Sequence, residues 1–146
     1  MEKENEKLAE FNIHPKLKSL FEQKDFGRYA DSNGKMRIAY IASNHTTGGN
    51  SGSPVINANG ELIGINFDRN WEGTMSDIIY DSTLVRNIFL DMHYALFIID
   101  KFAGAKNIID EYSAGETKNH GKYVDNYDKY IYHNEIIAFS VEFDYN

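Results

Sequence analysis

Ser51 lies in a glycine-rich stretch, GNSGSP over residues 49–54, that has the shape of a serine-protease nucleophile loop. A serine hydroxyl attacks a carbonyl well only when a base takes its proton, a further group orients that base, and donors stabilise the oxyanion. Glycine before the serine lets backbone N–H groups converge without obstruction by side chains. We therefore expect Ser51 as a nucleophile and the backbone amides of Gly49 and Ser51 as an oxyanion hole. A plain glycine turn in a β-protein is the alternative.

Strands and helices on either side of this loop must hold it in place. Residues 54–57 and 61–67 flank the dipeptide Asn59-Gly60, a strong signal for a hairpin. Residues 14–31 space apolar side chains as an amphipathic helix does, and residues 92–105 are apolar around most of a helix that ends at Gly104. We also expect strands over 36–43, 77–81 and 87–91, and one more helical turn over 106–112.

Composition excludes several classes of protein. With 146 residues, of which 42% are hydrophobic and 14% aromatic, the chain can build a packed core as one domain or as a piece of one. The net charge of −7, without a basic stripe, argues against a nucleic-acid partner. The absence of cysteine excludes disulfides and thiolate metal sites.

Membrane and cofactor signals are also missing from the sequence. No apolar run approaches the roughly 18 residues that span a bilayer, so we expect no membrane partner. The first ten residues, MEKENEKLAE, lack the apolar region of a signal peptide. We find no metal cluster, phosphate loop or cofactor box, and therefore expect no cofactor and no metal.

Three long stretches carry a resemblance to a known family. They are PKLKSLFEQKDFGRYAD (15–31), HTTGGNSGSPVINANGELIGINFDRNWEG (45–73) and LFIIDKFAGAKNIIDE (96–111). In this order they closely resemble the C-terminal end of the bacterial dipeptidyl-peptidases 7 and 11, serine exopeptidases that release dipeptides from peptide N-termini. The resemblance aligns Ser51 with the family nucleophile.

The resemblance implies a fold and a division of the chain. The expected fold is mainly β with helices: the C-terminal part of a chymotrypsin-like double β-barrel, followed by a buried C-terminal helix. Residues 1–112 correspond to this part of the peptidase, and residues 113–146 are an unmatched, tyrosine-rich extension. Family members are several times longer, with their catalytic histidine and aspartate well upstream. We therefore expect a fragment that is inactive alone.

The histidines of this chain fit that expectation. In a chymotrypsin-like order the base precedes the serine by a whole barrel, whereas His45 is only six residues before Ser51. His14 precedes a helix outside the family triad, and His93 is expected to be a structural histidine of the buried helix. The remaining two, His120 and His133, lie in the unmatched extension. We therefore predict that no histidine here is the triad base.

Two residues after the hairpin are expected to bind substrate. In chymotrypsin-like enzymes this strand forms a wall of the S1 pocket, so Arg69 is expected to meet the P1 side chain, where its guanidinium would pair with a carboxylate. The resemblance adds that family members with arginine here prefer Asp or Glu at P1, and that an aspartate at the position of Asp68 binds the peptide N-terminus. The alternatives are a solvated arginine at a strand end and a turn aspartate.

Two other functions stay open at this point. The chain is either part of a dipeptidyl-peptidase, a non-catalytic β-rich binding fragment, or a relative of trypsin-like endopeptidases. Arg69 beside Asp68 favours the first over the third, because an endopeptidase has no use for an amine anchor. For the full-length family, the resemblance implies a periplasmic or cell-surface homodimer that acts on peptide substrates.

Overall fold

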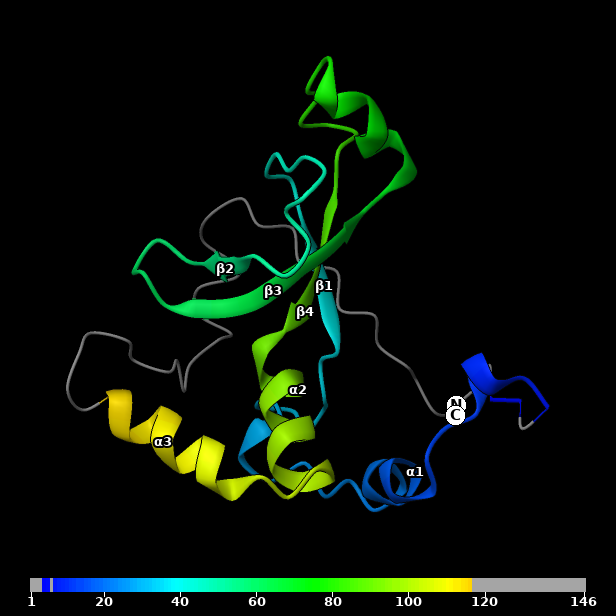
Figure 1. Ribbon diagram of the computed structural model, residues 1–146, viewed down its shortest axis with the longest axis vertical. Helices are drawn as coiled ribbons and strands as arrows, with labels where there is room; N and C mark the ends of the chain where they lie inside the picture. Colours follow the sequence, from blue (N-terminus) through cyan, green and yellow to red (C-terminus); the bar gives the residue numbers. More distant parts are fainter. Residues whose placement is uncertain (1–3, 6, 117–146) are drawn as a thin grey trace.

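Four antiparallel strands form one sheet in the order β1-β4-β3-β2 (Figure 1). The computed structural model describes residues 4–5 and 7–116, so most of the predicted extension over 113–146 lies outside the described residues. The strands are β1 (Ala39–Ala42), β2 (Pro54–Ile56), β3 (Leu62–Arg69) and β4 (Asn87–Asp91). The expectation of a mainly β sheet with several helices is confirmed. The predicted strand over 87–91 forms with the same ends, and those over 36–43, 54–57 and 61–67 form with shifted ends.

The β2–β3 hairpin turns where the sequence predicts. The backbone N–H of Gly60 donates to the Asn57 carbonyl at 3.0 Å, and the Asn57 side chain accepts from the N–H groups of Asn59 and Glu61 at 2.9 and 3.0 Å. The amide side chain thus satisfies the turn backbone, as Asn commonly does in tight turns. This hairpin sets the direction of β3, which carries Asn66, Asp68 and Arg69.

β4 pairs on both sides, with β1 and with β3, and its residues alternate between buried and half-buried. Its buried face carries Asn87, Phe89 and Asp91, each exposing 1% or less. Such alternation is typical of a strand with one face against a core. Two of these three side chains are polar, and each makes hydrogen bonds at one end of the strand.

The three α-helices gather at the end of the sheet where β4 finishes, at the bottom of Figure 1. The α-helices are α1 (Pro15–Glu22), α2 (Met92–Phe97) and α3 (Lys106–Glu116); η4 (Ile98–Phe102) is a π-helical turn, and η1 (Ala9–Phe11), η2 (Gly27–Tyr29) and η3 (Trp71–Asp77) are 3-10 helices. The Asp91 carboxylate caps α2 by accepting from the His93 N–H at 2.8 Å.

The predicted helix over 92–105 is present but not uniform. Its first half is α2, whose Met92, Leu96 and Phe97 are buried, and its second half is the wider turn η4, none of whose residues is fully buried. The C-terminal helix, which the sequence predicts to be buried, is therefore buried along its first half only. α3 continues to Glu116, beyond the predicted end at residue 112.

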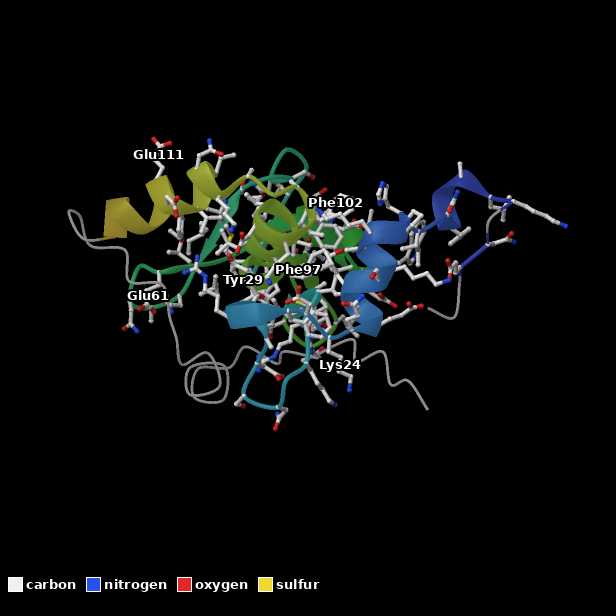
Figure 2. The ribbon with its side chains drawn as sticks, turned by 90° about the horizontal axis from the view of Figure 1, so that it is seen from below. Lys24, Tyr29, Glu61, Phe97, Phe102 and Glu111 are labelled. Atoms are coloured by element: carbon white, nitrogen blue, oxygen red, sulfur yellow. The ribbon has the colours of Figure 1, made fainter. Side chains whose placement is uncertain are left out.

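Aromatic side chains fill the space between these helices. Phe97 is fully buried and lies 5.9 Å from the rings of both Phe21 and Phe26, while Tyr29 is 2% exposed. Figure 2 shows Tyr29 and Phe97 among the side chains between the helices, with Glu111 on the outer side of α3. Edge-to-face ring pairs of this kind add to the stabilisation from buried area.

The predicted strand over 77–81 is wrong. Asp77 ends η3, and the N–H groups of Ile78 and Ile79 both donate to the Met75 carbonyl, at 3.0 and 2.9 Å. A turn then begins at Asp81, and the Asp81 carbonyl accepts from the N–H of Val85 at 2.9 Å. These local bonds satisfy the backbone that a strand would offer to a neighbour, while both edges of β4 already have partners.

Candidate active site

The loop over residues 46–53 holds Ser51 at the surface in a sharp bend. Gly49 and Gly52 have φ angles of +93° and +85°, which residues with a Cβ rarely adopt. The N–H of Asn50 donates to the Thr47 carbonyl at 3.3 Å, and the Asn50 side chain accepts from the Thr47 N–H at 2.7 Å. Ser51 itself is exposed. The glycines thus form the tight bend expected from the sequence.

Asn66 on β3 anchors this loop on both sides of Ser51. Its carbonyl accepts from the Gly52 N–H at 2.7 Å, its N–H donates to Ser53 O at 2.9 Å, and its side-chain Nδ2 donates to Asn50 O at 2.9 Å. Asn66 is 6% exposed, and its Oδ1 is buried without a partner among the described residues. The local sequence pattern does not reveal these bonds, because they join Asn66 to a loop 16 positions earlier.

The two amides expected to form the oxyanion hole remain available. In the part of the chain that the structure describes, the backbone N–H groups of Gly49 and Ser51 donate to no acceptor, whereas those of Asn50, Gly52 and Ser53 all do. Free amides at a bend are what an oxyanion site needs.

The described histidines are engaged elsewhere. His45 Nε2 lies 3.0 Å from the Ser76 carbonyl, His14 Nδ1 accepts from the Lys16 N–H at 3.1 Å, and His93 Nδ1 lies 3.0 Å from Asp91 Oδ1. Within residues 4–116, no histidine hydrogen-bonds to Ser51. His120 and His133 lie outside the described residues.

A β-bulge sets the direction of the two expected binding residues. The pairing of β3 with β4 shifts between Asn66 and Asp68, so Phe67 has no partner in the ladder. Phe67 and Asp68 are both exposed after the buried Asn66. Bulges often redirect side chains beside active sites. Asp68 Oδ1 accepts from the N–H of the next residue, Arg69, at 2.8 Å within the strand.

Arg69 is held between the loop over residues 46–53 and η3. Its Nη1 donates to the Thr46 carbonyl at 2.9 Å, at the start of the loop that carries Ser51. Nη1 and Nη2 also donate to the two carboxylate oxygens of Asp77, at 2.8 and 2.9 Å. These hydrogen bonds from Arg69 hold the pKa of the Asp77 carboxyl below its usual value. Arg69 is thus not a freely solvated arginine, and no pattern in the sequence indicates its carboxylate partner Asp77.

Asn87, the first residue of β4, contacts the residues that precede the loop carrying Ser51. It is fully buried, accepts from the Thr46 hydroxyl and donates to the Asn44 carbonyl. This contact ties the residues before the nucleophile loop to the central strand. An asparagine at a buried position of an otherwise apolar strand, in NIFLD, is the one sequence signal that could have pointed to it.

Two structural findings concern metals and membranes. Among the described residues, no three His, Cys, Asp or Glu side chains gather in a way that could hold a metal ion. None of the helices in the same part of the chain has the length and apolar character needed to cross a bilayer.

Comparison with known proteins identifies the family. Residues 1–114 match the family model described as Peptidase S46. The chain belongs to the peptidase S46 family. Over 111 residues it is 58% identical to the Asp/Glu-specific dipeptidyl-peptidase of Porphyromonas gingivalis and 57% identical to dipeptidyl-peptidase 7 of Phocaeicola vulgatus. Each match covers 76% of this chain and 15% of the relative.

Solved structures give the same result for this S46 chain. The crystal structure of DPP11 from Porphyromonas endodontalis matches it with a TM-score of 0.74 at 58% identity, over 76% of this chain and 16% of that one. The same protein has been solved in complex with the dipeptide Arg-Glu, with a TM-score of 0.73 to this chain. The resemblance expected from the sequence is therefore confirmed, and the chain spans about 15% of the length of the curated relatives it matches.

Proposed function

We propose that this S46 chain supplies the nucleophile and the specificity residues of a serine-type dipeptidyl-peptidase that prefers Asp or Glu at P1. The observation that carries the proposal is the hydrogen bond from Arg69 to the Thr46 carbonyl. It attaches a guanidinium to the loop that presents Ser51. A carboxylate in P1 would pair with that guanidinium through charge-assisted hydrogen bonds.

Each residue has a chemical task in this proposal. The Ser51 hydroxyl attacks the scissile carbonyl, and the unengaged amides of Gly49 and Ser51 stabilise the oxyanion that forms. Asp68, exposed beside Arg69, binds the α-ammonium of the peptide and so fixes the cut two residues from the N-terminus. The base and its orienting acid come from outside the described residues, because His45 is bonded to Ser76.

The sheet fits one part of the proposed whole enzyme. We assign strands β1 to β4 to a chymotrypsin-like double β-barrel, of which the four-stranded sheet supplies one section. The names of the relatives include both an Asp/Glu-specific enzyme and a dipeptidyl-peptidase 7 at nearly equal identity. Overall identity therefore does not decide the P1 preference, which the proposal assigns to Arg69. The full-length protein is proposed to be a periplasmic or cell-surface homodimer.

A non-catalytic binding role is the second candidate. It is favoured by the engagement of His45 at Ser76, which leaves Ser51 without a base among the described residues. A trypsin-like endopeptidase is the weaker alternative, because an exposed carboxylate at Asp68 serves an exopeptidase.

A graft separates these functions. Residues 1–112 replace the matching segment of the Porphyromonas endodontalis Asp/Glu-specific enzyme, to which this chain is 60% identical over 111 residues. We measure kcat/KM for dipeptidyl substrates with Glu or Leu at P1. The graft should prefer Glu, and Arg69→Gly should move the preference towards Leu by roughly a hundredfold, because a P1 carboxylate then loses its hydration without gaining a partner.

The nucleophile is tested in the same graft. Ser51→Ala should lower turnover by several orders of magnitude while dipeptide binding survives, and Ser53→Ala is the matched control. The 146-residue chain alone should show no turnover. Retention of a tenth of the activity by Ser51→Ala would exclude Ser51 as the nucleophile. An equal loss on both substrates in Arg69→Gly would mean that Arg69 supports the fold and does not contact P1.

A further inference from the structure

η3 is folded around the side chain of Arg69. A Cβ built on Gly73 would lie 3.3 Å from Arg69 Cδ, so the arginine stem runs directly against this buried glycine. At the far end of η3, Ser76 Oγ and both oxygens of Asp77 face the guanidinium, at 3.3, 2.8 and 2.9 Å. The stem and the head of Arg69 therefore both contact the same seven-residue element.

The hydrogen bonds of Arg69 leave one edge of its guanidinium open. The group carries five N–H donors: one on Nε and two on each Nη. The Thr46 carbonyl and one Asp77 oxygen take those of Nη1, and the second Asp77 oxygen takes one of Nη2. Among the described residues, the Nε–H and the second Nη2–H have no acceptor. These two lie on one edge of the plane and form the second fork that can hold a carboxylate.

We propose that Asp77 is a positioning residue for Arg69, fixing the Nη1–Nη2 edge so that the Nε–Nη2 edge is presented to an acidic P1 side chain. This inference rests on the proposed function, since it assumes that Arg69 contacts P1. A long arginine side chain otherwise loses rotamer freedom when it binds a ligand. Here Asp77 and Thr46 restrict the guanidinium before any ligand arrives, so less conformational freedom is lost on binding. The fixed fork then favours a carboxylate, which accepts two hydrogen bonds, over an uncharged P1 side chain.

The charge of Asp77 acts in the opposite direction. The carboxylate of an acidic P1 side chain would bind the same guanidinium as Asp77 and would be repelled by the negative charge of Asp77. The side chain of Asp77 is 46% exposed, so solvent and salt screen this repulsion more than they weaken the direct hydrogen bonds, at 2.8 and 2.9 Å, that orient Arg69. Orientation is therefore expected to dominate, and the effect of Asp77→Asn on acidic substrates shows which of the two prevails.

The kinetic test uses the grafted peptidase with matched P1 Glu and P1 Gln substrates. Asp77→Asn should lower kcat/KM for the Glu substrate by about tenfold and change that for the Gln substrate by less than about twofold. Asp77→Glu, which keeps the carboxylate, should restore most of the preference. Glu72→Gln removes a charge from the same η3 element without touching Arg69 and should leave both substrates unchanged.

A spectroscopic test on the 146-residue chain keeps the two proposals apart. With the arginine side chains labelled with ¹⁵N, the Arg69 Nη protons should exchange with water at least about tenfold faster in Asp77→Asn than in the wild type or in Glu72→Gln. Unchanged exchange would overturn the positioning role. An increase in kcat/KM for the Glu substrate, or an equal loss on Glu and Gln, would also overturn it. If proton exchange at Arg69 accelerates in Asp77→Asn but the graft without substitutions shows no preference for Glu, the proposed function is wrong while the positioning of Arg69 by Asp77 stands.

Discussion

The two ends of the sheet are built differently (Figure 1). The helical end is held by aromatic packing, with Phe97 buried among Phe21, Phe26 and Tyr94. At the site end, hydrogen bonds and the Arg69–Asp77 ion pair join the described loops, and although Val85 is buried, Trp71 and Ile78 are 86% and 85% exposed. Apolar burial supplies most folding free energy, whereas hydrogen bonds fix directions. Aromatic packing and the hydrogen-bonded loops of the candidate site therefore lie at opposite ends of the sheet.

β4 connects the two ends through one face. Phe89 packs in the sheet core against Tyr40 at 5.3 Å, Asp91 caps α2 at the helical end, and Asn87 ties down the residues before the nucleophile loop. Because residues i, i+2 and i+4 of a strand share a face, one five-residue strand serves the core and both ends.

The helical end should show the largest effect on stability. Phe97→Ala removes a fully buried ring and should cost about 3–5 kcal/mol in the free energy of unfolding of the 146-residue chain, measured by urea denaturation. Phe67→Ala is the control, because that ring is 47% exposed at the site end, and it should cost less than about 1 kcal/mol. Equal losses from the two variants would contradict the separation of the two ends.

An intermediate effect is expected where β4 meets the site. Asn87→Ala leaves the Asn44 carbonyl and the Thr46 hydroxyl without their buried partner, which should cost about 1–3 kcal/mol in unfolding free energy. Amide hydrogen exchange should accelerate in residues 44–47 and not in α2. Asn107→Ala, on an exposed position of α3, is the control and should leave stability nearly unchanged. A loss confined to the helical end would show that Asn87 serves the core and not the loop.

The same division explains what the sequence could predict. The hairpin at Asn59-Gly60 and the helix expected within 14–31, which forms over 15–22, depend on neighbours a few residues away, so their periodicity and turn chemistry are visible in the sequence. The resemblance located Ser51 and Arg69 without showing their contacts. Those contacts join Arg69 to Thr46 across 23 positions, and no local pattern encodes such a distance.

The wrong prediction over 77–81 has the same cause. The segment DIIYD is apolar and β-prone, so its pattern indicates a strand. In the structure Asp77 pairs with Arg69 and ends η3, and Ile78 and Ile79 remain exposed at 85% and 69%. The backbone of this segment bonds locally and Asp77 pairs with Arg69, a residue distant in sequence, so the β propensity of DIIYD is not realised.

The smallest effect is expected at the exposed apolar side chains of this same segment. Ile78→Ser replaces a side chain that is already 85% exposed, so it gives up almost no buried area and should change the unfolding free energy of this chain by no more than about 0.5 kcal/mol. Ile63→Ser is the matched control: Ile63 is 6% exposed in the sheet core, and its loss combines lost burial with a buried hydroxyl, so it should cost several kcal/mol. Both are measured by urea denaturation of the 146-residue chain under one set of conditions. A loss above about 1 kcal/mol in Ile78→Ser would mean that this side chain is covered in solution, and the site end would then depend on apolar burial as the helical end does.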